Sequence, residues 1–325
     1  MTMAELAGPL FDFTFSWEKR ADAPRSLIKG TSVTHGDVSY FGPYDSNEVF
    51  SYNSVKDEWQ RLPPLPQDQQ NFRLTVIKGE LTAIGGEIES EYVGFVKSER
   101  SLTGRLLTYT GNEWSEDIVP AMPTRRVFPS VVQVDKYLIV AGGQTRKTAL
   151  STVEVLDLEN MKWHKAADLP EHLCEMSATV CGGRLYLAGG LGLKGATHSV
   201  YSCSVTMLLM SCGLQQSEEF EPATTELEVW SKESEVLPWN RCTLITLNDQ
   251  LLAIGGVDSH GNPTDEIVFY HQKKWYVVGR LRTATRHEFL LTLVENKLIV
   301  VGGFFIDSPE PRATVEVAKI AVSGK

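Results

Sequence analysis

The stretch that decides the fold is YLIVAGGQTRKTALSTVEVLDLENMKW, residues 137–163. It begins with a short apolar run, continues through the pair Gly142-Gly143 and closes on Trp163. A second run, Val153-Glu154-Val155-Leu156, lies between the glycines and the tryptophan. Both runs predict strands, because they are short, rich in β-branched residues and bounded by turn residues, and no helical period of 3.6 residues runs through them.

The same marks recur along the whole chain. The tryptophans are Trp17, Trp59, Trp114, Trp163, Trp230 and Trp275, and the glycines that follow them are Gly42, Gly85, Gly142, Gly189, Gly255 and Gly302. The intervals from each tryptophan to its glycine are 25, 26, 28, 26, 25 and 27 residues. The intervals from each glycine to the next tryptophan vary from 17 to 41 residues. This spacing indicates a repeat protein in which one part of each unit accepts insertions.

Each repeat predicts a four-stranded antiparallel unit. An apolar run such as Ser130-Val131-Val132 precedes the strand that ends in the glycines, and the turn Val134-Asp135-Lys136 joins the two into a hairpin. A third strand follows the glycines, and the tryptophan opens a fourth strand that ends near a Leu-Pro mark such as Leu169-Pro170. Four strands in about 50 residues match one blade of a β-propeller.

These marks resemble the kelch repeat, in which a glycine pair follows the second strand and an aromatic or apolar residue stands about six places before a tryptophan. Leu156 and Trp163 keep that spacing, and no tryptophan is followed by Asp, as in the rival propeller repeat. The resemblance implies an all-β fold, a six-bladed kelch β-propeller with four antiparallel strands per blade. Pro43 replaces the second glycine of the first repeat, so the first blade is expected to turn differently.

The two ends of the chain are expected to share one blade. Trp17 has no glycine pair before it, and the last strand, Thr314-Val315-Glu316-Val317, has no tryptophan after it. We therefore expect the strand around residues 11–17 to close the last blade, which leaves no open edge. The expected single domain, 1–325, divides into blades at about 25–66, 67–123, 124–170, 171–238, 239–283, and 284–325 together with 10–24.

Composition excludes several classes of function. The net charge of −10 argues against general binding to nucleic acid or anionic membranes. No apolar run approaches the ~20 residues of a membrane span, and no secretory signal is visible at the N-terminus. The five cysteines are an odd number without a visible secretory signal, which predicts reduced thiols. They form no CxxC pair, which argues against a zinc site. We expect a cytoplasmic protein without nucleic acid, membrane, metal or cofactor among its partners.

Candidate binding residues gather on one predicted face. In a propeller, the loops that enter the first strand and leave the second strand share the face around the central channel. The residues predicted for this face are mostly cations and aromatics: Arg25, Arg73, Arg125, Arg126, Arg146, His172, Trp239, Arg241, Arg286, His287, Phe304 and Phe305. Arginine suits a carboxylate ligand, because its planar fork donates two parallel bonds. Alternatively, these arginines belong to the repeat itself and bond backbone carbonyls between blades.

No catalytic signature accompanies these residues. The sequence lacks GxSxG, HExxH, phosphate-loop and dinucleotide-binding motifs, and no catalytic residue is predicted. By resemblance to kelch propellers, the predicted function is a protein-interaction module that holds an acidic segment of a partner protein across the loop face. The alternative is an enzyme of small anionic sugars, similar to kelch-type sialic-acid epimerases. Such a site needs a carboxylate and a histidine inside an arginine-lined cavity, for which Glu175, His172 and Arg286 are candidates, with Glu288 near them. Fold alone does not decide between them.

Overall fold

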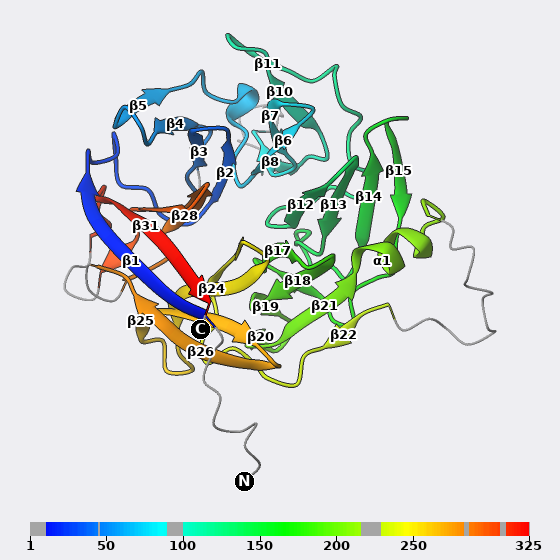
Figure 1. Ribbon diagram of the computed structural model, residues 1–325. Helices are drawn as coiled ribbons and strands as arrows, with labels where there is room; N and C mark the ends of the chain where they lie inside the picture. Colours follow the sequence, from blue (N-terminus) through cyan, green and yellow to red (C-terminus); the bar gives the residue numbers. More distant parts are fainter. Residues whose placement is uncertain are drawn as a thin grey trace.

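The computed structural model describes residues 11–44, 46–89, 100–215, 229–282, 286–305 and 310–324. Six four-stranded antiparallel sheets form the frame of these residues and surround a central channel (Figure 1). The predicted all-β fold built from repeated four-stranded sheets is confirmed. No helix in these ranges is long and apolar enough to cross a membrane.

The strands of each sheet follow in chain order from the channel outward, except that the last sheet ends on the N-terminal strand. The first sheet contains β2 (Thr31–His35), β3 (Val38–Gly42), β4 (Phe50–Asn53) and β5 (Glu58–Arg61). The second contains β6 (Arg73–Ile77), β7 (Glu80–Ile84), β10 (Leu106–Tyr109) and β11 (Trp114–Ser115). The third contains β12 (Ser130–Val134), β13 (Tyr137–Ala141), β14 (Val153–Asp157) and β15 (Lys162–Lys165).

The remaining sheets have the same plan. The fourth contains β17 (Ser177–Cys181), β18 (Arg184–Ala188), β21 (Val200–Ser204) and β22 (Ser231–Lys232). The fifth contains β23 (Thr243–Leu247), β24 (Gln250–Val257), β25 (Pro263–His271) and β26 (Lys274–Arg280), and the sixth β28 (Leu290–Val294), β29 (Lys297–Val301), β31 (Val315–Gly324) and β1 (Phe11–Arg20).

Short elements decorate this frame. Small sheets near the channel mouth are formed by β8 (Glu87–Ile88) with β9 (Ser101–Leu102), by β16 (Leu173–Cys174) with β19 (Leu191–Gly192) and β20 (Gly195–Ala196), and by β27 (Arg286–His287) with β30 (Phe304–Phe305). The only helical segments among the described residues are η2 (Pro66–Asp68) and α1 (Val205–Ser211). Leu208 and Leu209 of α1 are buried in the core between the third and fourth sheets, so this insertion is part of the fold.

The two ends of the chain close the ring in one sheet. Strand β1 pairs with β31 over its whole length, from Phe11 opposite Gly324 to Arg20 opposite Val315, and Figure 1 shows the blue and red strands side by side. The aromatic face of β1 also reaches the fifth sheet, where the ring of Phe13 lies 5.3 Å from that of Phe269. The predicted closure by the N-terminal strand is confirmed.

The repeat tryptophans tie neighbouring sheets together. The indole Nε1 of Trp59 donates to the carbonyl of Ala21 at 3.1 Å, which links the first sheet to the chain that leaves the sixth. Equivalent bonds of 2.8, 3.0 and 3.1 Å join Trp114 to Pro63, Trp163 to Pro120 and Trp230 to Ala167. The Nε1 of Trp275 is buried without such a partner in the described part of the chain, so the seam before the fifth sheet lacks this bond.

The glycine pairs bring each second strand against the chain that enters the next sheet. A Cβ on Gly142 would lie 2.3 Å from the carbonyl oxygen of Leu173, and a Cβ on Gly302 would lie 1.9 Å from that of Leu27. Both pairs adopt positive φ, which glycine tolerates best. Gly42 does not share the positive φ, so the first repeat turns differently, as Pro43 suggested.

Buried ion pairs support two of these glycine turns. Arg126 donates from Nη1 to the carbonyl of Gly142 at 2.7 Å and from Nη2 to Glu154 at 2.5 Å, and both side chains are buried. Arg286 makes the same contacts with Gly302 at 3.2 Å and Glu316 at 2.7 Å. Burial lowers the pKa of Arg286 to about 10, and Glu316 opposes this shift, so the guanidinium stays charged at neutral pH.

Removing β1 should weaken the whole molecule. Deletion of residues 1–20 exposes the edge of β31 and removes four half-buried aromatic side chains from the seam with the fifth sheet. Buried aromatic residues contribute about 3–5 kcal/mol each when fully packed, so we expect a large fall in melting temperature and aggregation through the open edge. Thr14→Ala, on the exposed face of β1, is the control. An unchanged melting temperature of the shortened chain would contradict the closure.

The ion pair of Arg126 gives a second prediction. Arg126→Met leaves Glu154 buried without its partner and should lower the free energy of unfolding by about 3–5 kcal/mol. Replacing both residues, Arg126→Met with Glu154→Leu, should recover most of that loss, because no isolated charge remains. Urea denaturation of both variants and of Arg125→Met, at the exposed neighbouring position, measures the difference. Equal stability of the single and double variants would show that the loss does not come from an unpaired charge on Glu154.

Candidate functional site

The central channel holds a cavity of about 550 Å³. Its walls are formed by the innermost strands of the sheets, which carry many hydroxyl side chains. These hydroxyls bond the neighbouring strands: Ser177 accepts a bond from the backbone N–H of Leu244 at 2.8 Å, and Thr179 and Thr246 share one of 3.0 Å. These hydroxyls of the channel wall are therefore hydrogen-bonded within the protein. The charged and aromatic side chains that a ligand could contact lie at the mouth.

One residue per sheet stands in a left-handed backbone conformation two places before the innermost strand. These six residues, here called the ring residues, are Lys29, Asn71, Phe128, Glu175, Arg241 and Glu288, with φ between 47° and 57°. Left-handed φ is uncommon outside glycine and costs energy, so its recurrence marks a position that the surrounding fold enforces. All of them except Asn71 line the cavity.

The charged ring residues pair with one another. The Nζ of Lys29 lies 3.8 Å from carboxylate oxygens of both Glu175 and Glu288, and Arg241 donates to Glu288 at 2.9 Å. All four side chains are only partly exposed. The mouth thus offers mixed charge in a semi-enclosed setting, where pairing is less screened than on an open surface.

An aromatic pair crosses the mouth beside these charges. The rings of Tyr44 and Phe128 stack with centroids 5.8 Å apart and planes 18° apart. Lys29 lies 5.2 Å from the Tyr44 centroid, and the guanidinium of Arg73 lies 5.9 Å from that of Phe128. Each ring therefore has a cation nearby, within the range where the negative face of an aromatic ring attracts positive charge.

Arg73 begins the innermost strand of the second sheet and projects into the cavity lining. Its Nε donates to the carbonyl of Pro129 at 3.0 Å, and its Nη1 donates to the carbonyl of Gly30. These bonds join Arg73 to the sheets on both sides. Burial lowers the pKa of Arg73, and Glu175 partly offsets the shift.

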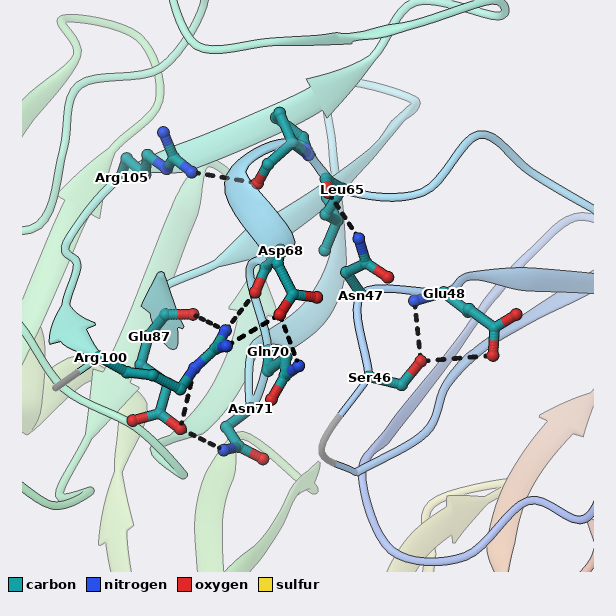
Figure 2. A network of polar contacts seen from close by, with 11 residues as sticks. Ser46, Asn47, Glu48, Leu65, Asp68, Gln70, Asn71, Glu87, Arg100 and Arg105 are labelled. Carbon is teal, nitrogen blue, oxygen red and sulfur yellow. Dashed lines mark hydrogen bonds and ion pairs between the residues drawn. The ribbon is translucent and has the colours of Figure 1, made fainter. Parts of the chain in front are cut away.

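The sixth ring residue, Asn71, is engaged elsewhere. Its amide donates to Glu87 at 3.0 Å, and Glu87 also faces Arg100, whose Nη1 lies 2.8 Å from Asp68 (Figure 2). This network joins β8 and Arg100 to η2. It also holds the side chain of Asn71 outside the cavity lining.

The predicted site residues fall into three groups: those that line the cavity, those that lie outside its lining, and those that are buried in the core. Arg73 and Arg241 line the cavity. Arg25, Arg125, Arg146 and His172 are exposed but lie outside the lining; Arg25 pairs with Glu48, and His172 shares a hydrogen bond of 3.0 Å with the carbonyl of Ala149. His287 and Phe304 are half-buried and stack on each other with centroids 5.5 Å apart, also outside the lining.

Arg126, Trp239, Arg286 and Phe305 form the third group and must be corrected, because they are buried in the core and cannot face a ligand. Arg126, Trp239 and Arg286 each stand four residues before an innermost strand, and this position is buried in all six sheets. The residue two places later has a left-handed backbone, and it lines the channel in every sheet but the second. Arg126 and Arg286 do bond backbone carbonyls, but those of Gly142 and Gly302 in their own sheets. The alternative explanation, an arginine that bonds carbonyls between sheets, describes Arg73.

Several residues of the mouth were absent from the predicted binding set. They are Lys29, Tyr44, Phe128, Glu175 and Glu288. All of them except Tyr44 stand two residues before the first residue of an innermost strand, so counting back from that strand in each repeat would have identified them.

The four residues named for the sugar-enzyme alternative do not all reach the cavity. Glu175 and Glu288 both reach the mouth, but Arg286 is buried beneath it and His172 lies outside the lining. Among the described residues, no three His, Cys, Asp or Glu side chains are grouped to hold a metal ion.

Comparison with known proteins supports the repeat assignment. The kelch motif matches residues 125–170. Kelch-like protein 35 of Mus musculus is 25% identical over 211 residues, which cover 64% of this chain and 31% of that protein. Kelch-like protein 36 of Rattus norvegicus is 21% identical over 279 residues, covering 84% of this chain and 42% of that protein. Each alignment thus spans less than half of the relative's length.

A solved structure confirms the fold. The structure of YjhT superposes with a TM-score of 0.71 at 15% identity and covers 94% of this chain and 99% of that one. At this identity the likeness concerns the fold alone. The motif match, the curated relatives and the ring of four-stranded sheets together support the kelch-repeat assignment.

Proposed function

We propose that the channel mouth binds a short segment of a partner protein and that this segment carries an acidic side chain. The observation that supports this most is the cavity of about 550 Å³, with Lys29, Arg73 and Arg241 at its entrance in a chain whose net charge is −10. Three cations against the carboxylates of Glu175 and Glu288 leave a local positive excess. By resemblance, kelch propellers commonly hold partner segments on this face.

The mouth suits a peptide better than a bulk surface contact. Tyr44 and Phe128 offer a flat apolar contact with little conformational freedom to lose, and the cations at their edges fix the direction of a charged group. A partner carboxylate can join Glu288 on Arg241, because a guanidinium has five N–H donors. Aromatic and arginine side chains in a sheltered pocket are the usual anchors of protein interfaces.

Loss of two mouth cations should abolish partner capture. Charge-assisted bonds contribute about 1.5–3 kcal/mol each, so Lys29→Ala with Arg241→Ala should weaken binding by roughly a hundredfold. Affinity capture from an extract of the source, with bound proteins quantified by mass spectrometry, compares this variant with the wild type. Binding of the captured partner should also weaken with added salt.

Arg280→Ala is the matched control. Arg280 lies at the end of the outer strand β26, is exposed and is outside the cavity lining. It pairs with Asp265 and Glu266 of the neighbouring strand β25. It should leave both capture and melting temperature unchanged. Partners retained equally by the double variant and the wild type would exclude the mouth as the binding site.

A further inference from the structure

Arg73 differs from the two arginines in the core by lacking a carboxylate. Arg126 has Glu154 at 2.5 Å and Arg286 has Glu316 at 2.7 Å, whereas no described carboxylate forms an ion pair with Arg73. Its hydrogen bonds to described residues come from Nε and Nη1 and go to neutral backbone carbonyls. A half-buried guanidinium without a counter-ion is costly, so its presence calls for a reason.

The repeat does not supply that reason. The first residues of the other innermost strands are Thr31, Ser130, Ser177, Thr243 and Leu290, all uncharged. Thr31 accepts a bond from the backbone N–H of Leu74, and Ser130 donates to the carbonyl of Met176 at 2.9 Å, so a small hydroxyl suffices to join the sheets here. A long cation at this position is a departure specific to the second sheet.

We propose that Arg73 is the counter-ion for the carboxylate of an Asp or Glu side chain that the bound segment inserts into the channel. This rests on the proposed function and names the residue that reads the acidic group. Phe128 packs near the guanidinium, and the bonds to Pro129 and Gly30 hold it in place, which prepares the fork before a ligand arrives. Nη2, which makes no hydrogen bond to these carbonyls, remains available to the carboxylate.

The surrounding charges permit an anion at this depth. Glu175 is the nearby carboxylate that acts on Arg73, and its own charge is met by Lys29 at 3.8 Å. Glu288 is likewise met by Lys29 and Arg241. An incoming carboxylate therefore meets Arg73 as the cation whose charge is least compensated at the mouth.

The first arm of the test measures stability without ligand. Arg73→Met removes a charge that no described carboxylate pairs with, so its melting temperature should equal or exceed that of the wild type. Arg126→Met, which strands Glu154, serves as the contrasting variant and should melt much earlier. A loss for Arg73→Met as large as that for Arg126→Met would show that Arg73 is a structural link between sheets, and it would overturn the proposal.

The second arm measures recognition with a phage library of random seven-residue peptides. Peptides selected on the wild type should be enriched in Asp or Glu at one position, and their affinity should fall about tenfold or more on Arg73→Met. Arg73→Lys keeps the charge and should retain the acidic preference with weaker binding, whereas Arg280→Met should change nothing. The same acidic peptides selected equally well by Arg73→Met would overturn the proposal.

Three further outcomes separate the possible errors. If inorganic phosphate displaces the selected peptides and raises the melting temperature of the wild type but not of Arg73→Met, the site serves a free anion and not an acidic side chain. If peptides bind the mouth but lack acidic residues, the proposed function stands and the role of Arg73 is wrong. If the wild type selects no peptide, the proposed function itself fails.

Discussion

The structure depends on the contact between a glycine pair and the chain that enters the next sheet, which is closest after the second, third and sixth sheets. The first glycine approaches the neighbouring backbone so closely that no Cβ fits at Gly142 or Gly302, and the second donates an N–H to the same carbonyl, at 2.9 Å from Gly143 to Leu173 and at 3.0 Å from Gly303 to Leu27. This contact fixes the entering chain. Two residues after the bonded carbonyl, that chain takes the left-handed turn that directs Glu175 and Lys29 at the channel. The contact of the glycine pair therefore accounts both for the regular position of the glycines in the repeat and for which residues reach the mouth.

Three arginines show how surroundings decide the role of one residue type. Arg126 and Arg286 are fully buried, and a carboxylate on the third strand of the same sheet compensates each of them. Arg73 has only carbonyl partners among the described residues and opens onto a cavity. For Arg126 and Arg286, a carboxylate of the protein offsets the cost of desolvating the guanidinium. For Arg73, we propose that a carboxylate of the bound partner does so.

The sequence predicted the fold well because its marks are local. Tryptophan and glycine spacing fixes the strand order, and the odd marks at the two ends fixed the closing strand. The site was predicted less well, because residues only two positions apart in the sequence lie in the core in one case and at the channel in the other. Arg126 and Arg286 are thus buried, while Phe128 and Glu288 face the mouth. The stacking of Tyr44 on Phe128 joins residues of different sheets and follows from no local pattern.

The antiparallel pairing of the first and last strands makes the molecule a closed circuit whose starting point is arbitrary. Phe11 lies opposite Gly324, so a short connector between them would form an ordinary hairpin and join the ends without disturbing the ring. New ends could then be opened in an exposed connection between sheets, in a circular permutant with the same channel. The position of the new ends would decide which sheet is completed by two strands from opposite ends of the chain. That sheet would be expected to separate first when the molecule is pulled apart.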